Sequence, residues 1–374
     1  MIKEIHIENY KSIQKLKLEL GRVTVLIGEN GCGKSNILEA IALSAAAASH
    51  KLDNEFLASR GIRETEPQLM RAAFDKENVT QEIKISFGEN KEIYFDYVLQ
   101  NKNKPYAKWT NETPHLDDFI LKQLASTDEP SEKALKKALE DFKKASKPVV
   151  HSAQKKSLQE FIIYSPEYHC LRNFKEEGQI RPLGINGEGL FKLLQVLSLD
   201  KDKLNEIKEK LKLMGWFKDF QVPNNLFIGE RAIQIEDRYL DREITFDQRS
   251  TNEGFLFLLF YFCLFISEDT PPFFAIDNID ASLNPKLCRQ LIKELANLAK
   301  NYDKQVIFTT HNPAILDGLN LNDDEQRLLV VSRNQSGYTR ARRFLKPETP
   351  EGEEPITLSE AFLRGYLGGL PKSF

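Results

Sequence analysis

The chain has 374 residues, which is enough for two or three folding units of about 150 residues each. A hydrophobic content of 41% and a charged content of 29% are typical of a globular protein and exclude a collagen-like or wholly disordered chain. The 52 Lys and Arg residues are balanced by 55 Asp and Glu residues. The resulting net charge of −3 excludes a surface that attracts nucleic acid or anionic membrane from all sides.

The cysteines predict neither a zinc site nor a disulfide framework, because they are few and widely spaced, at Cys32, Cys170, Cys263 and Cys288. The first ten residues alternate apolar and charged side chains and lack the apolar core of a signal peptide. The longest apolar run, around residues 255–266, is too short to span a bilayer. We therefore expect a soluble, cytoplasmic protein with reduced thiols and no membrane partner.

Hydrophobic periodicity predicts strands that alternate with helices along much of the chain. The predicted strands are residues 2–7, 23–27, 161–164, 273–276 and 306–309, with a hairpin over 81–99. The predicted helices are 34–44, 131–147, 190–213, 285–300 and one that starts near residue 254. This alternation favours an α/β fold whose parallel sheet is covered on both faces.

Residues 28–35 read G-E-N-G-C-G-K-S and match the phosphate-loop pattern G-x-x-x-x-G-K-[ST]. They lie between a buried strand and a helix start, where backbone N–H groups and the helix N-terminus can bind phosphates. Lys34 is predicted to neutralise the β- and γ-phosphates, and Ser35 to offer its hydroxyl to Mg²⁺. The predicted site for ATP comprises Asn30, Gly31, Cys32, Gly33, Lys34, Ser35 and Asn36.

Two further residues follow buried strands. Asp277 ends the run F-F-A-I-D, where a carboxylate can hold Mg²⁺; the structural alternative is a helix-capping acid. His311 follows the strand that ends at Thr310, where an imidazole can reach the γ-phosphate or the attacking water. We predict that Lys34, Asp277 and His311 are catalytic, with Ser35 and Asp277 as metal ligands.

With these anchors, the chain resembles the ABC-type ATPases of the RecF/SMC/OLD group, often described as AAA-family ATPases. The segments that carry the resemblance are residues 2–13 (I-K-E-I-H-I-E-N-Y-K-S-I), 36–41, 276–285 (I-D-N-I-D-A-S-L-N-P) and 309–316 (T-T-H-N-P-A-I-L). With the ending L-S-E-A-F-L-R-G-Y-L-G-G-L-P-K-S-F, the chain is most similar to small bacterial anti-phage defence ATPases without a fused nuclease.

The resemblance implies a P-loop fold of the ABC type, with a mixed, mainly parallel sheet, flanking helices, an antiparallel β portion and an inserted helical region. The expected parts are residues 1–100 (phosphate loop and hairpin), 101–225 (helical insertion) and 226–374 (the rest of the ATPase core).

The resemblance also assigns roles to residues outside the phosphate loop. Asn252 and Gly254 stand where the family has a Ser-x-Gly turn that binds the ATP of the opposite subunit; the structural alternative is a helix cap. Residues 281–284 resemble the D-loop at the dimer seam. Tyr10 and Lys11 match positions that contact adenine, with a strand-end surface role as the alternative, and Gln68 is a candidate Q-loop glutamine.

One departure from the family affects the expected rate. The family normally has Glu directly after the metal-binding Asp; this chain has Asn278, which we add to the predicted catalytic residues. An amide cannot act as a general base, whose contribution is typically about 10² to 10⁴ in rate. We therefore expect slow hydrolysis. Asp280 could partly replace the missing Glu, but we prefer the interpretation that it is a structural acid of the D-loop.

The implied mechanism is a homodimer, and in some cases a higher oligomer, that closes around ATP and Mg²⁺ and controls a separate, nuclease-like effector protein. The chain lacks long heptads, a C-x-x-C hook and a downstream acidic triad. Two alternatives stay open: a RecF-like repair ATPase that binds duplex DNA, and a scaffold with purely structural nucleotide. Arg340, Arg342, Arg343 and Lys346 are the candidate nucleic-acid patch, although a solvated hairpin face is preferred.

Overall fold

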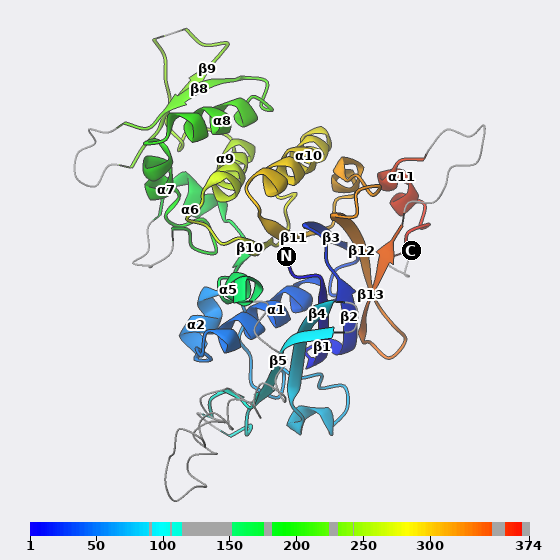
Figure 1. Cartoon of the computed structure of the whole chain (residues 1–374). Helices are drawn as coiled ribbons and strands as arrows, with labels where there is room; N and C mark the ends of the chain where they lie inside the picture. Colours follow the sequence, from blue (N-terminus) through cyan, green and yellow to red (C-terminus); the bar gives the residue numbers. More distant parts are fainter. Residues whose placement is uncertain are drawn as a thin grey trace, which may run out of the picture.

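The structure is a computed structural model that describes residues 1–89, 92–104, 107–113, 152–175, 182–223, 231–241, 243–345 and 356–368. Its centre is a six-stranded sheet of order β13-β12-β3-β11-β10-β7 (Figure 1). The strands are β3 (Val23–Ile27), β7 (Ile163–Tyr164), β10 (Phe273–Ile276), β11 (Gln305–Thr310), β12 (Gln326–Arg333) and β13 (Thr339–Phe344). The strands from β12 to β7 are parallel and β13 is antiparallel, which confirms the predicted mixed, mainly parallel sheet.

The two faces of this sheet bury separate hydrophobic cores. On β3, Val23, Val25 and Ile27 face the core that contains α9 (Glu253–Ile266) and α10 (Pro285–Asn301). Leu26 faces the other core, which contains α1 (Lys34–Ala48). Figure 1 shows the sheet between these two layers. Because both faces are covered, β3 is a continuous apolar run and not an alternating one.

A five-stranded antiparallel sheet of order β2-β1-β4-β5-β6 covers part of the second core. Its strands are β1 (Glu4–Tyr10), β2 (Ile13–Glu19), β4 (Ile83–Glu89), β5 (Glu92–Gln100) and β6 (Thr110–Asn111). The apolar residues Ile5, Ile85 and Leu18 face inward, while charged residues alternate with them on the solvent side. This sheet confirms the predicted antiparallel portion and the hairpin over residues 81–99.

A helical lobe, at the upper left of Figure 1, contributes its buried residues to the core that contains α9 and α10. It contains α6 (Tyr168–Arg172), α7 (Leu190–Leu197), α8 (Lys201–Leu211), β8 (Phe217–Gln221) and β9 (Gln234–Asp237). The prediction of one helix over residues 190–213 is wrong. Asp200 caps α8 by accepting hydrogen bonds from Asp202 N at 3.1 Å and Lys203 N at 3.2 Å, so the chain turns between two helices.

The remaining short elements are α2 (Asn54–Ser59), α5 (Ser152–Gln159), α11 (Leu358–Leu363) and the 3-10 helices η1 (Asn78–Thr80) and η2 (Pro313–Gly318). Although β7 and α5 belong to the predicted insertion, β7 is an edge strand of the central sheet and α5 packs against α1. The three-part division of the chain stays a prediction. The predicted helix over residues 131–147 lies outside the described residues.

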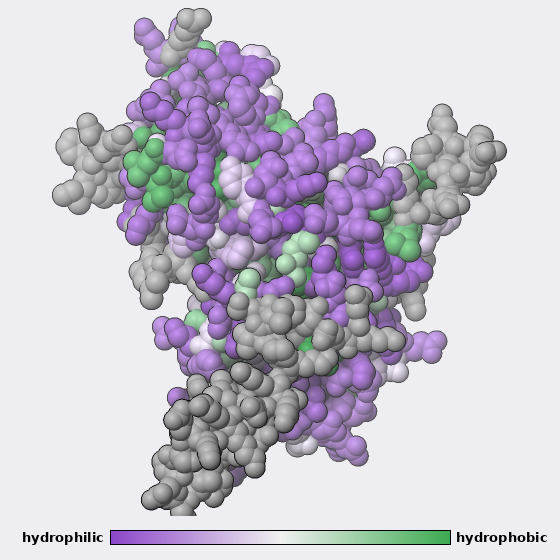
Figure 2. All heavy atoms as spheres, viewed as in Figure 1, coloured by the Kyte–Doolittle hydropathy of each residue, from purple (hydrophilic) through white to green (hydrophobic). Residues whose placement is uncertain are grey.

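The described helices include none that is both long and apolar enough to cross a membrane. Hydrophilic residues cover most of the face in Figure 2, with hydrophobic residues in small separate groups. All four cysteines are free and buried. Among the described residues there is no cluster of three or more His, Cys, Asp and Glu side chains that could hold a metal ion.

Candidate nucleotide-binding and catalytic site

The phosphate-loop residues 28–35 connect the end of β3 to the start of α1, at the carboxyl edge of the parallel sheet. Gly33 is the N-cap of α1, with a φ of 107°, and no side chain caps this helix. By contrast, Asn252 Oδ1 accepts from Phe255 N at 2.9 Å to cap α9, and Asn284 caps α10 in the same way. The N–H groups that start α1 are therefore left for an anion.

Lys34 is buried, with 6% of its surface exposed, and among the described residues no carboxylate lies in hydrogen-bond range of its ammonium group. Its Nζ donates to the carbonyls of Gly28 at 2.9 Å and Glu29 at 3.0 Å, and lies 3.8 Å from Cys32 Sγ. Burial lowers the pKa of Lys34, while Cys32 and Asp277 act in the opposite direction. A cation held only by neutral groups fits a site that takes a phosphate.

The proposed metal ligands meet across the sheet edge. Ser35 Oγ donates to Asp277 Oδ2 at 3.0 Å, although the two residues are 242 positions apart. Thr309, near the end of β11, donates from its hydroxyl to Asp277 Oδ1. A hydroxyl and a carboxylate on one side of a phosphate loop are the donor set that Mg²⁺ takes, together with phosphates and waters. The residues therefore fit this ion.

Asn278 is exposed and begins the turn after β10. Its N–H donates to Thr309 Oγ1 at 2.9 Å, and its φ is 56°, a region where Asn is several-fold enriched. Asp280 accepts from Thr310 Oγ1 at 2.6 Å, so this carboxylate is already engaged with β11. The preferred interpretation of Asp280 as a structural acid agrees with this contact.

His311 lies beside the phosphate loop, immediately after β11. Burial and the charge of Lys34 lower its pKa, whereas Asp280, Asp277 and a hydrogen bond with the Gly28 backbone act in the opposite direction. The structure thus brings His311, Lys34 and Asp277 together, as the sequence pattern predicted. Their catalytic roles stay predictions.

Lys11 and Asn36 line a pocket of about 460 Å³ next to the phosphate loop. The Lys11 ammonium is held by Glu39 of α1 and by the Arg63 carbonyl at 2.9 Å. Asn36 Nδ2 donates to Ser12 Oγ at 2.7 Å. Tyr10 is fully buried and bonds to Glu39, so in this conformation it cannot contact a base directly.

Sequence reasoning missed Arg63, which lines the same pocket. Its Nε donates to Glu39 Oε1 at 2.5 Å and its Nη2 to Asn36 Oδ1 at 3.4 Å, so the guanidinium lies beside the residue that follows Ser35. Arg63 follows α2 in a loop with no recognisable motif. Only the repeated arginines of R-G-I-R could have indicated it.

The predicted signature residues lie at the start of α9. Asn252 caps this helix, as its structural alternative required, and the side chain of Glu253 accepts from Ser282 Oγ at 2.6 Å. A Cβ added to Gly254 would lie 3.3 Å from Ser282 O, so the turn packs closely on the predicted D-loop. Gln68 is exposed and bonds to Glu66, and its Q-loop role stays a prediction.

Arg340, Arg342 and Arg343 of the candidate nucleic-acid patch lie on β13. Arg343 pairs with Glu19 at 3.5 Å and Asp324 at 3.3 Å, and Arg342 donates to Leu367 O at 3.0 Å. Lys346 lies outside the described residues. These contacts favour the solvated hairpin face over a nucleic-acid patch.

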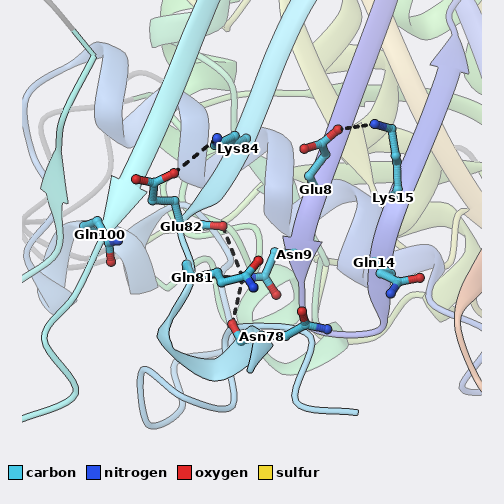
Figure 3. A pocket seen from close by; sticks show the side chains of 9 residues that line it. All are labelled: Glu8, Asn9, Gln14, Lys15, Asn78, Gln81, Glu82, Lys84 and Gln100. Atoms are coloured by element: carbon cyan, nitrogen blue, oxygen red, sulfur yellow. Dashed lines mark hydrogen bonds and ion pairs between the residues drawn. The ribbon is translucent and has the colours of Figure 1, made fainter. Parts of the chain in front are cut away.

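A second polar pocket, of about 580 Å³, lies on the antiparallel sheet (Figure 3). Both of its lysines are paired, Lys15 with Glu8 at 2.7 Å and Lys84 with Glu82 at 3.2 Å. Asn9 Nδ2 donates to three carbonyls of the loop that precedes β4, at 2.9–3.2 Å. With its charges balanced internally, this pocket is a poorer anion site than the phosphate loop.

The sheet order and the phosphate loop are those of a P-loop ATPase fold of the ABC type. Nucleotide and Mg²⁺ are the ligands that such a fold implies. A family model described as "AAA domain, putative AbiEii toxin, Type IV TA system" matches residues 23–317, well over half of the chain. The chain therefore belongs to this family. The match runs from β3 to η2 and includes Lys34, Asp277 and His311.

Curated relatives match only a short segment. The chain is 46% identical over 55 residues to the DNA replication and repair protein RecF of Bacillus thuringiensis (strain Al Hakam) and to that of Bacillus cereus (strain B4264). The match covers 14% of this chain and 15% of each relative.

Among solved structures, an SmcHead bound to the C-winged helix domain of ScpA is similar, with a TM-score of 0.55 and 16% identity. The match covers 92% of this chain and 98% of the SmcHead chain, and shows that the two chains have a similar fold.

Proposed function

We propose that this protein is an ATP-binding, slowly hydrolysing ABC-type ATPase that dimerises around nucleotide and switches a partner effector. The observation that carries the proposal is the hydrogen bond between Ser35 and Asp277, the proposed metal ligands, next to an amide at Asn278 in the place of the usual carboxylate. Such a site can bind Mg-ATP but has no general base at this position.

The chemistry of the site follows from its own side chains. Lys34 and the N–H groups at the start of α1 bind and orient the phosphates. Ser35 and Asp277 would hold Mg²⁺, which supplies charge neutralisation to the transferred phosphoryl group. We assign to His311 a hydrogen bond to the γ-phosphate or to the attacking water. Asn278 can orient a water but cannot take its proton, so ATP stays bound for longer than in an enzyme with Glu.

The dimer is proposed from the position of the signature turn. Asn252 and Gly254 lie at the start of α9 and pack on residues 281–284. The two segments that we expect to contact the opposite subunit are therefore neighbours. A two-fold dimer would close two sites, each made of one phosphate loop and one signature turn. Nucleotide then stabilises the closed state only by its differential affinity for it.

A separate effector and a role in anti-phage defence belong to the same proposal. In their support, the family description reads "putative AbiEii toxin, Type IV TA system", and toxin–antitoxin systems have two components. The similar SmcHead is described as bound to another protein, a domain of ScpA. We propose that the partner is a nuclease-like protein encoded nearby, and that the ATP-bound dimer holds or releases it.

Turnover and mass test the proposal together. Purified protein with saturating Mg-ATP should hydrolyse well below roughly 10 per second, a typical enzyme rate. Light scattering should show that the mass of the wild-type protein doubles with Mg-ATP. The Lys34→Met variant should keep the mass of a monomer under the same conditions. Fast turnover, or a mass that ATP leaves unchanged, contradicts the switch. Nucleotide bound with no Lys34-dependent phosphate release supports a purely structural role.

A RecF-like repair ATPase is the second candidate, because the 55-residue segment shared with RecF is 46% identical. It predicts that the isolated protein binds duplex DNA with an affinity that falls steeply with salt. A mobility-shift titration at about 50 mM and about 200 mM salt separates the two functions. Absence of a shift at low salt counts against the repair function.

A further inference from the structure

The outer side of the phosphate loop is covered by the C-terminal hairpin β12–β13, which lies beyond the segment matched by the family model. A Cβ added to Gly28 would lie 2.1 Å from the carbonyl oxygen of Val331 on β12. A Cβ added to Gly33 would lie 2.1 Å from Thr339 Oγ1 on β13. The hairpin therefore requires glycine at both positions, independently of the phosphates.

Two side chains of the hairpin hold successive carbonyls of the loop. Arg333 Nε donates to Gly31 O at 2.8 Å, and Thr339 Oγ1 donates to Cys32 O at 2.9 Å. In a trans peptide the N–H group points away from the carbonyl. Holding the Cys32 carbonyl toward the hairpin therefore turns the Gly33 N–H toward the opposite side, as phosphate binding requires.

Thr339 is fixed in place by the turn between β1 and β2. Its N–H donates to Ser12 O at 2.8 Å, and its hydroxyl lies 2.6 Å from Ser12 Oγ. Asn36 of α1 donates to the same Ser12 oxygen at 2.7 Å. A hydroxyl has one proton to donate, and Thr339 donates its proton to Cys32 O, so Ser12 donates to Thr339 and accepts from Asn36. Ser12 and Thr339 are 4% and 1% exposed.

We propose that Thr339 is a positioning residue for nucleotide binding: its hydroxyl, oriented by Ser12, holds the phosphate loop in its anion-binding conformation. This inference rests on the proposed nucleotide binding. The hydroxyl contacts the loop backbone and Ser12, so it acts through the Gly33 N–H. The same hairpin also contacts the segment that follows Phe74, a residue that lines the pocket, because Tyr338 donates to Asp75 Oδ2 at 2.8 Å.

The test compares nucleotide affinity in Thr339→Val and Thr339→Ser. Valine keeps the strand-forming shape but removes the donor and leaves Cys32 O unpaired. Titration calorimetry of the full chain with Mg-ATP should show affinity about tenfold weaker for Thr339→Val, and within about twofold of wild type for Thr339→Ser, because serine restores the hydrogen bond. In the absence of nucleotide, Thr339→Ser should melt at the wild-type temperature.

A second pair of variants keeps the test valid if Thr339→Val unfolds. Arg333 and Arg340 are both exposed arginines of this hairpin, and among the described contacts only Arg333 bonds to the loop. Arg333→Met should weaken Mg-ATP binding several-fold, and Arg340→Met, with the same charge change, should leave it unaltered.

The outcomes separate the inference from the function on which it rests. Wild-type affinity in a folded Thr339→Val protein, or equal affinity in Arg333→Met and Arg340→Met, overturns the positioning role while nucleotide binding stands. No binding by the wild-type chain overturns both. Weakening in Thr339→Val with recovery in Thr339→Ser supports the inference.

Discussion

Ser35 Oγ and Asp277 Oδ2 lie 3.0 Å apart and join the start of α1 to the end of β10. Parallel strands place their carboxyl ends at one edge, so β3 and β10 deliver these two side chains to the same point with β11 between them. Thr309 of β11 fixes the second carboxylate oxygen. The hydrogen bonds of the protein itself therefore hold the two proposed metal ligands next to each other.

Replacing Ser35 should uncouple Mg²⁺ from nucleotide. In Ser35→Ala, Lys34 and the loop N–H groups still bind phosphate, but the hydroxyl ligand is lost. We expect nucleotide affinity that is the same in Mg²⁺ and in EDTA, measured by calorimetric titration. Ser59→Ala, on the exposed end of α2, is the control and should keep the wild-type response to Mg²⁺. A normal Mg²⁺ response in Ser35→Ala would remove Ser35 from the site.

Asn278→Glu should raise the rate of ATP hydrolysis, which we propose is slow in the wild-type protein. A carboxylate can accept the proton of the attacking water, so we expect turnover to rise by about 10² and the lifetime of the ATP-bound dimer to fall. Because φ at position 278 is 56°, Glu should also cost about 1 kcal/mol of folding stability. Asn278→Gln carries the same backbone cost without a base. Equal turnover in the Glu and Gln variants argues against the missing base as the cause of slow hydrolysis.

Lys34→Met separates ligand binding from folding. The buried ammonium is desolvated and held by carbonyls, so its replacement should leave the stability of the ligand-free protein no lower than wild type. Nucleotide at 100 times its dissociation constant stabilises a folded protein by about 2.7 kcal/mol. Thermal denaturation should show this gain in wild type and in the exposed control Lys51→Met, but not in Lys34→Met.

Glu39 supports the pocket from inside α1. It is 1% exposed and accepts from Arg63 and Tyr10 while pairing with Lys11. Glu39→Gln removes the buried anion that pairs with Lys11 and Arg63, and should lower the free energy of unfolding by about 2 kcal/mol. Urea denaturation measures the loss, and Glu55→Gln on exposed α2 should cause none. An unchanged urea midpoint in Glu39→Gln would mean that the network adds no stability.

Lys304 predicts how stability depends on pH. Burial lowers its pKa to about 8, and its Nζ donates to Thr270 O at 2.9 Å. An unfolded lysine has a pKa of about 10.4, so between these values the unfolded chain holds a proton that the folded chain has lost. Lys304 therefore adds stability as pH rises from about 8 to about 10.4.

The measurement is the melting temperature of wild type and Lys304→Met across this pH range. Relative to Lys304→Met, wild type should gain stability as pH rises. The exposed variant Lys300→Met should follow the wild-type curve. Parallel curves for wild type and Lys304→Met would show that the buried amine does not titrate in this range.

The sequence by itself determined the local parts of this protein. The strand V-T-V-L-I, the glycine turn and the helix from Lys34 are contiguous, and Asp277 and His311 each follow a buried strand. Such signals depend on neighbours in the chain, so patterns of apolar residues and glycines were enough to predict them. The break at Asp200 had a local signal as well, an acid able to cap a new helix, which the apolar periodicity obscured.

Only the tertiary structure decided which distant side chains complete the site. Arg63 contacts Glu39 and Asn36 beside the phosphate loop, and Thr339 reaches Cys32 across 307 positions, yet neither residue belongs to a motif. Their contacts depend on how the two sheets and the C-terminal hairpin pack around the loop. Packing of this kind is set by the summed burial of many residues. No local sequence pattern therefore indicates that the Thr339 hydroxyl meets the Cys32 carbonyl or that the Arg63 guanidinium meets Glu39.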